Sequence, residues 1–292
     1  MISDMKVILS RKGFDGINGG MPSLIMPNGD AVTMPIPSND HVLYKSLKYG
    51  DKDYLSILKD LKPRFSCREC HLDPDLDSRR MEDRPKGWKP AFGQIGASAL
   101  YLMNTVGLKP GDLFLFFGNF RFVEERGGKL HFVSRTGDFY HDKTIQLIWG
   151  YLQVGAIITD GDRIRKEYPW HPHASTRRIR ESSNILIVPS KTLSFAKSRP
   201  GCGLLRFVED RVLTRKGSNK ATWRKNPAYS PKSIIGSRKN MASDGIYYSG
   251  IWQELGLKES VVATRWARHI VLCGGKGDVA WSTWGRDSAQ HN

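Results

Sequence analysis

Residues 111–121 read GDLFLFFGNFR, and this stretch indicates the kind of fold to expect. Its continuous apolar run, after the turn at Pro110-Gly111, is short enough for a strand that is buried on both faces. Gly127-Gly128 predicts a hairpin turn, with a returning strand over residues 130–133. A second long strand is expected over residues 145–158, bent at one of its two glycines.

The rest of the chain contains further predicted strands and helices and one irregular segment. We expect further strands at residues 6–10, 184–188 and 204–213, helices at 47–61, 95–106 and 259–272, and an irregular arm rich in glycine and proline over 11–30. This order favours an α+β fold. We predict a single compact domain over residues 1–292, with a central mixed, strongly curved sheet or partial barrel flanked by helices, and residues 110–215 as its sheet-rich core.

Charge and composition indicate the class of partner. The 292 residues carry a formal net charge of +16, together with 8 Trp, 10 Tyr and 12 Phe. Such a basic, aromatic-rich chain favours contact with phosphate and with bases, so DNA or nucleotides are the expected partners. No apolar stretch reaches spanning length and the start lacks a long apolar run, so we expect a cytoplasmic protein with no membrane contact.

The sequence Cys70-His71-Leu72-Asp73-Pro74-Asp75-Leu76 is the strongest candidate for chemistry. In an extended chain alternate side chains share a face, so His71, Asp73 and Asp75 are predicted to point the same way. They are candidates for general acid or base, and Asp73 and Asp75 for a divalent metal ion. The alternative is a turn in which the carboxylates cap backbone N–H groups or pair with nearby arginines. The residue types alone favour neither.

A glycine-rich loop follows the first predicted strand. Arg11 and Lys12 precede Asp15, and Gly19-Gly20 follow. Backbone N–H groups of such a loop can bind phosphate, with the two cations adding charge. We therefore predict phosphate binding here and include Asp15 among the catalytic candidates. A solvated surface loop is the alternative.

Three further stretches offer substrate-binding candidates. Gln94, ahead of a helix, can contact a base edge or serve as a cap-region residue. Arg121, after the buried strand, can face a cleft or pair with a nearby glutamate. Trp149 and Gln153 alternate with Tyr151, which predicts one shared face suited to a base, although core packing is commoner for a strand tryptophan.

Residues 170–178, WHPHASTRR, contain two histidines followed by two arginines. His171 and His173 can bind phosphate or metal. The favoured interpretation is a surface loop whose Arg177 and Arg178 contact the nucleic acid backbone.

Several of these blocks together resemble the third nucleotide modification associated domain family. They are the opening strand with the glycine-rich loop, the Cys70–Leu76 block, and residues 92–97, 111–121 and 148–155. The resemblance runs in order over nearly the whole chain. It implies a role beside DNA- or nucleotide-modifying enzymes in bacteria, phages and mobile elements, with such enzymes encoded nearby as further partners.

Two hypotheses about function follow. In the first, the protein is an enzyme that acts on a nucleotide or on a base in DNA, with a basic phosphate-binding surface and a His/Asp site. In the second, it is a non-catalytic module that binds nucleic acid or modified bases through a small barrel, an analogy of pattern only.

Overall fold

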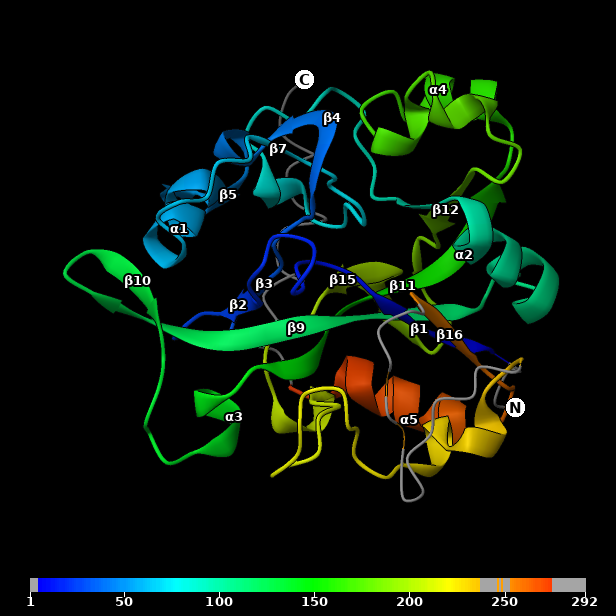
Figure 1. Ribbon diagram of the computed structural model, residues 1–292. Helices are drawn as coiled ribbons and strands as arrows, with labels where there is room; N and C mark the ends of the chain where they lie inside the picture. Colours follow the sequence, from blue (N-terminus) through cyan, green and yellow to red (C-terminus); the bar gives the residue numbers. More distant parts are fainter. Residues whose placement is uncertain (1–4, 237–245, 247, 249–252, 275–292) are drawn as a thin grey trace.

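The computed structural model describes residues 5–236, 246, 248 and 253–274, and its centre is a ten-stranded mixed sheet (Figure 1). Six strands form the main path in the order β16-β1-β9-β11-β12-β8. Their bounds are Glu254–Leu257, Val7–Arg11, Leu113–Arg126, Ile145–Ile158, Ile185–Pro189 and Phe92–Gln94. Four more extend it: β2 (Ser23–Ile25), β3 (Ala31–Val32), β10 (Lys129–Phe132) and β15 (Cys202–Leu204).

Strand directions make the sheet mixed. β9 lies parallel to β1 and β2 and antiparallel to β10 and β11, while β12 is antiparallel to both β11 and β8. The two ends of the path, β16 and β8, do not pair with each other. The sheet is therefore open, and the prediction of a strongly curved sheet or partial barrel is not supported. The α+β class is confirmed.

Short elements surround the sheet. The helices are α1 (Tyr54–Leu61), α2 (Gly96–Leu100), α3 (Phe139–Asp142), α4 (Gly161–Glu167) and α5 (Val261–Leu272). Two-stranded pairs are β4–β7 (Pro37–Leu43, Glu69–Cys70), β5–β6 (Lys48–Tyr49, Lys52–Asp53) and β13–β14 (Thr192–Leu193, Ala196–Pro200). The element η3 (Tyr101–Val106) is a π-helix that continues α2. Short 3₁₀ helices are η1 (Tyr44–Ser46), η2 (Ser78–Arg80), η4 (Pro172–Ala174), η5 (Arg178–Arg180), η6 (Glu209–Arg211), η7 (Pro227–Tyr229) and η8 (Pro231–Ser233).

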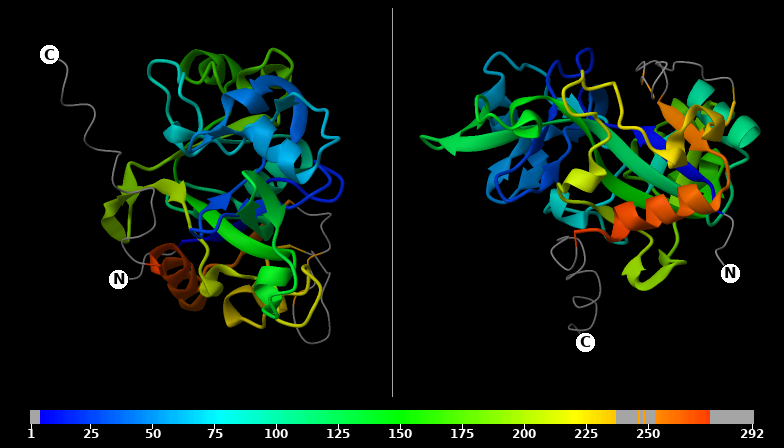
Figure 2. Two further views of the ribbon diagram at one scale, coloured as in Figure 1. Left: turned by 90° about the vertical axis from the view of Figure 1, so that its left-hand side faces the viewer. Right: turned by 90° about the horizontal axis from the view of Figure 1, so that it is seen from below.

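Helices cover both faces of the sheet (Figures 1 and 2). Because side chains alternate along a strand, Ile8 packs on one face with η3, while Val7 and Leu9 pack on the other with α5. The helix α5 begins at Ser260, whose side chain accepts a hydrogen bond from the backbone N–H of Ala263. A separate core behind the glycine-rich loop includes α1, and α4 belongs to a small fourth core.

A bulge in β11 changes which side chains share a face. The register against β9 shifts between Ile148 and Gly150, so one extra residue is inserted there. An inserted residue moves all later side chains to the opposite face. Trp149 consequently packs in one core and Tyr151 in the other, and the predicted shared face of Trp149, Tyr151 and Gln153 is wrong.

Most other element predictions are confirmed, and three are wrong. Residues 47–53 contain the short strands β5 and β6, so the helix begins only at Tyr54. Residues 23–25 form β2 inside the arm expected to be irregular, and residues 205–213 contain η6 instead of a strand. The single domain over residues 1–292 stays a prediction. The sheet draws β1, β2, β3, β8 and β16 from outside residues 110–215.

Among the described residues, no helix combines the length and the apolar character needed to cross a membrane.

Candidate metal centre

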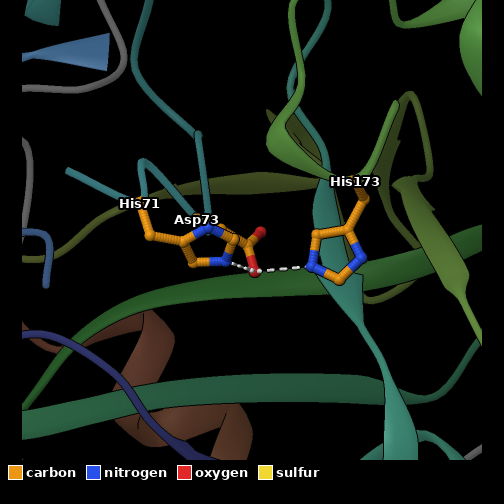
Figure 3. Close-up of side chains that lie close together, drawn as sticks. All are labelled: His71, Asp73 and His173. Carbon is orange, nitrogen blue, oxygen red and sulfur yellow. Dashed lines mark ion pairs between the residues drawn. The ribbon is translucent and has the colours of Figure 1, made fainter. Parts of the chain in front are cut away.

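Asp73 lies at the centre of a group of histidines. One oxygen, Oδ1, accepts a 2.8 Å hydrogen bond from the backbone N–H of Gly93 and lies 3.3 Å from Nε2 of His171. The other, Oδ2, lies 3.6 Å from Nε2 of His71 and 3.8 Å from Nε2 of His173 (Figure 3). Thus the backbone and His171 fix one oxygen, and the second points between two imidazole rings.

The His71 ring is oriented by Asp40. Because β4 pairs with β7, Asp40 lies beside His71, and Nδ1 of His71 donates to Oδ2 of Asp40 at 2.7 Å. Arg178 donates to both oxygens of Asp40. Burial opposes ionisation of Asp40, but these bonds outweigh it and hold its pKa well below the usual range. An ionised Asp40 can only accept, so Nδ1 of His71 carries a proton.

The His173 ring is oriented by Asn184. The amide nitrogen of Asn184 donates to the backbone oxygen of His173, so its Oδ1 faces Nδ1 of the ring, at 2.6 Å. Burial lowers the pKa of His173 to about 3, so the ring is neutral and its single proton lies on Nδ1. Its Nε2 therefore presents a lone pair toward Asp73.

These ligand atoms have the arrangement of a metal site. One atom each from His71, Asp73 and His173 lies within 4.8 Å of the others. Each histidine donates its Nδ1 proton to an oxygen, the bond that usually orients a metal-ligating imidazole. Burial opposes ionisation of Asp73, but the histidines outweigh it and hold its pKa well below the usual range. A carboxylate facing two imidazole nitrogens is stabilised by a cation or a proton between them.

Protonation of His71 fills that position when no metal is bound. Burial lowers its pKa, but the carboxylates of Asp40 and Asp73 outweigh burial and raise it above the usual value. A metal ion bound to Nε2 would replace this proton, because only the neutral imidazole is a ligand.

The three residues open into a pocket of about 370 Å³, here called the metal pocket. Its other walls come from β1, the glycine-rich loop, β8 and residues after β8, with Arg11, Lys12 and Arg178 as cations. Three carboxylates, those of Asp15, Asp40 and Asp73, balance these three cations. A divalent ion would give the pocket a positive balance that suits an anionic substrate.

A family model described as Nucleotide modification associated domain 3 matches residues 6–250, most of the chain. The chain belongs to this family. No curated protein matches the chain, and no solved structure matches it. The resemblance carried by the sequence blocks is thereby confirmed, and membership associates the protein with nucleotide modification. The matched region of the family model includes His71, Asp73 and His173.

In this family member, the predicted glycine-rich loop forms a turn beside the metal pocket. Asp15 lines the pocket, and its Oδ1 accepts a 2.6 Å hydrogen bond from the backbone N–H of Asn18. Gly19 and Gly20 have positive φ, and a Cβ at residue 19 would lie 2.3 Å from the Phe14 ring. The two glycines shape the turn and are not among the described residues that line the pocket.

The two adjacent cations at the end of β1 are both paired with carboxylates. Arg11 Nη2 lies 3.5 Å from Asp15 Oδ2, and Lys12 Nζ lies 3.2 Å from Oε1 of Glu254. Gln94 donates from Nε2 to the same oxygen of Glu254, which is fully buried in β16. Gln94 and Lys12 therefore line the pocket while being held in place by this carboxylate.

Asp75 is not brought together with His71 and Asp73, so the predicted shared face extends over only two of the three residues. Arg84 donates to both oxygens of Asp75, and the indole N–H of Trp88 donates to Oδ2 at 3.0 Å. This pairing directs Asp75 away from the metal pocket. The structure thus follows the alternative interpretation at Asp75, a carboxylate that pairs with a nearby arginine.

Besides Gly19 and Gly20, four predicted substrate-binding residues lie outside the lining of the metal pocket: Arg121, Trp149, Gln153 and Arg177. Arg121 donates to a backbone oxygen of the β10 hairpin and packs over Phe132. Trp149 is buried against Phe116. Gln153 bonds to Ser194 through both amide atoms, and Arg177 is exposed.

Sequence reasoning offers a weak signal for His173 and none for Asp40 or Asn184. His171 and His173 stand two apart, and metal binding is one of their alternatives, but the pattern favours a surface loop. Both are 3% exposed. Asp40 lies about thirty residues before His71, so only the pairing of β4 with β7 shows their contact.

Proposed function

We propose that the protein is a metal-dependent enzyme of a DNA- or nucleotide-modification system. His71, Asp73 and His173 hold a divalent transition-metal ion, and the anionic substrate occupies the rest of the metal pocket. One observation carries the proposal: three potential ligand atoms converge in the lining of one pocket, with the Nδ1 atom of each imidazole bonded to an oxygen acceptor.

The donor set supports a transition metal. Two imidazole nitrogens and one carboxylate oxygen suit zinc or ferrous iron better than magnesium or calcium, which prefer oxygen ligands alone. Three protein ligands also leave coordination positions open, as catalytic sites require. The ion would polarise a substrate oxygen or bind a reacting water, while the protein orients the ligands and the substrate.

The residues around the three proposed ligands orient the ligands or face the substrate. Asp40 and Asn184 fix the ring orientations. Asp15, with Arg11, borders the pocket from the other side, where Asp15 can accept a proton from the substrate or orient it. Asp75 has no part in the site that we propose.

The alternative of a small-barrel binding module loses its structural basis, because the sheet is open. A basic chain with a net charge of +16 still supports nucleic-acid contact, which an enzyme of this kind also needs.

The test compares nucleosides and metal content. Nucleosides from DNA and from the nucleotide pool are analysed by mass spectrometry in cells that carry the native gene neighbourhood. The wild type is compared with His173→Ala and, as a matched control, with His141→Ala, a histidine on α3 outside the pocket lining. The purified proteins are analysed for bound metal.

We expect His173→Ala to lose both the metal and one modified nucleoside, while the control keeps both. A wild-type protein that binds no transition metal would contradict the metal centre. An unchanged nucleoside profile despite metal loss would contradict its catalytic role.

A further inference from the structure

A second hollow adjoins the metal pocket at Arg11. It has a volume of about 550 Å³, and we call it the flanking groove, defined by Arg11, Asn119, Phe139, Lys143, Gln146 and Lys220. Arg11 connects the two, because one of its guanidinium nitrogens lies 3.5 Å from Asp15 of the metal pocket. Its guanidinium also packs 5.9 Å from the ring centre of Tyr248, which lines the groove.

The groove differs from the metal pocket in charge. Arg11, Lys143 and Lys220 line it, and none of the described lining residues is acidic. In the metal pocket, by contrast, three carboxylates balance three cations. Lys143 and Lys220 are exposed, and neither forms an ion pair with any of the residues that the structure describes. Unbalanced lysines along a groove are suited to phosphates of a nucleic acid backbone.

A buried amide offers a hydrogen-bond donor to the groove. The indole N–H of Trp223 can only donate, and it donates to Oε1 of Gln146 at 2.5 Å. Gln146 therefore donates from Nε2 to Oδ1 of Asn119, at 3.3 Å. This order leaves Nδ2 of Asn119 facing the groove. Asn119 is only 5% exposed, and within the described residues its Nδ2 makes no hydrogen bond.

Such a donor points to a ligand with acceptor oxygens. Although the residue is 5% exposed, Nδ2 of Asn119 is not among the fully buried polar atoms that lack a partner, so it reaches the groove, where a phosphate, sugar or base oxygen can accept its hydrogen bond. The partly exposed ring of Phe139 at the same groove provides a face on which a base can stack.

We infer that the flanking groove binds the stretch of single-stranded nucleic acid next to the nucleotide in the metal pocket. This inference rests on the proposed function of that pocket. The substrate is then a polynucleotide strand and not a free nucleotide. A single strand is required because Asp73 and His173 are buried, and a base inside a duplex cannot reach them without leaving the stack.

The test measures binding of a fluorescein-labelled single-stranded DNA about 12 nucleotides long, within the usual range of single-strand sites, by fluorescence anisotropy. Unlabelled competitors are the same strand as RNA, the duplex, and thymidine monophosphate. Variants are Asn119→Asp and the double variant Lys143→Ala/Lys220→Ala. The matched control is Lys45→Ala/Lys166→Ala, two exposed lysines that line neither hollow.

We expect the strand to bind at least about tenfold more tightly than the monophosphate or the duplex. In Asn119→Asp the carboxylate can still accept from Gln146, but it replaces the donor with a negative charge, so affinity falls about tenfold. The double lysine variant should make the salt dependence shallower by about 1.4 logarithmic units per unit of log salt, about 0.7 for each lost phosphate contact.

Equal affinity for strand and monophosphate, or groove variants that behave like the control, would overturn the inference. Preference for the duplex would also overturn it, whereas competition by DNA or by RNA identifies which strand is bound. Circular dichroism checks the fold of Asn119→Asp, and the exposed lysines provide a test that does not depend on it. Metal content, measured separately, reports on the proposed function, because no groove residue is a proposed metal ligand.

Discussion

Gly93 allows the ring of His173 to lie directly against the backbone of β8. A Cβ at residue 93 would lie 2.3 Å from Cδ2 of His173, far inside contact distance. The same residue donates its N–H to Asp73, so one backbone position fixes both a carboxylate and an imidazole of the proposed centre.

Gly93→Ala should therefore displace His173. We expect a loss of about 1–3 kcal/mol in the free energy of unfolding, as for other overpacked sites, together with weaker metal binding. Denaturant unfolding and metal titration measure the two effects. Gly16→Ala, where a Cβ meets nothing within 4 Å, is the control and should change neither.

Asp73→Asn tests the ligand assignment against the neighbouring carboxylate. The amide keeps an oxygen for the N–H of Gly93 but loses the charge, so we expect metal affinity to fall at least about 100-fold with the fold retained. Asp75→Asn should destabilise the protein, since Arg84 loses its charged partner, without changing metal affinity. Calorimetric titration with zinc and with ferrous iron distinguishes the two. Equal losses of affinity in both variants would contradict the assignment.

Asp40→Asn tests the orientation of His71. The variant removes the charge that holds the Nδ1 proton, and we expect metal affinity to fall about 10- to 100-fold. Asp162→Asn on the exposed surface of α4 is the control. An Asp40→Asn protein with wild-type metal affinity would show that the bond between Asp40 and His71 serves the fold alone.

Stability should depend on pH through Asp77. Burial opposes its ionisation, but the bonds to Arg79 outweigh burial and lower its pKa below the ordinary 3.8. A depressed folded-state pKa gives stability that is complete above the unfolded pKa and is lost as the pH falls through the folded value. We expect wild type and Asp77→Asn to differ by about 1 kcal/mol or less near pH 6, because Arg79 is partly exposed, and to converge as the pH falls from 3.8 through the lower pKa of the folded state. Urea unfolding over this pH range measures the difference, and a gap that widens in acid would contradict this role.

The long strands and the helix α5 could be predicted because their signals are local. The apolar run of β9 and the paired glycines after it are contained in one window of sequence. A bend at one of the two glycines of β11 could also be predicted, but the residue inserted between Ile148 and Gly150 could not, because it depends on how β11 pairs with a strand about thirty residues away. That single inserted residue separates Trp149 from Tyr151 and removes the predicted base-binding face.

Only part of the candidate site could be predicted from the sequence. His71 and Asp73 share one extended segment, so their spacing alone predicts a common face. His173 joins them from about a hundred residues away, and a histidine between prolines and arginines resembles a surface residue until its burial is known. Asp75 has the same spacing as Asp73 but pairs with Arg84, nine residues further along the chain, and the residue types alone do not decide between this pairing and a shared face.

Asp73 lies between one imidazole from the segment after β7 and another from η4, two parts of the chain that are otherwise joined through Asp40 and Arg178. An ion held by all three ligands would act as a removable cross-link between those segments. At a concentration about 100 times its dissociation constant, it would add about 2.7 kcal/mol to the free energy of unfolding. Chelation would then appear first as faster amide hydrogen exchange in η4 and the segment after β7, while the protection of β9 and β11 stays unchanged.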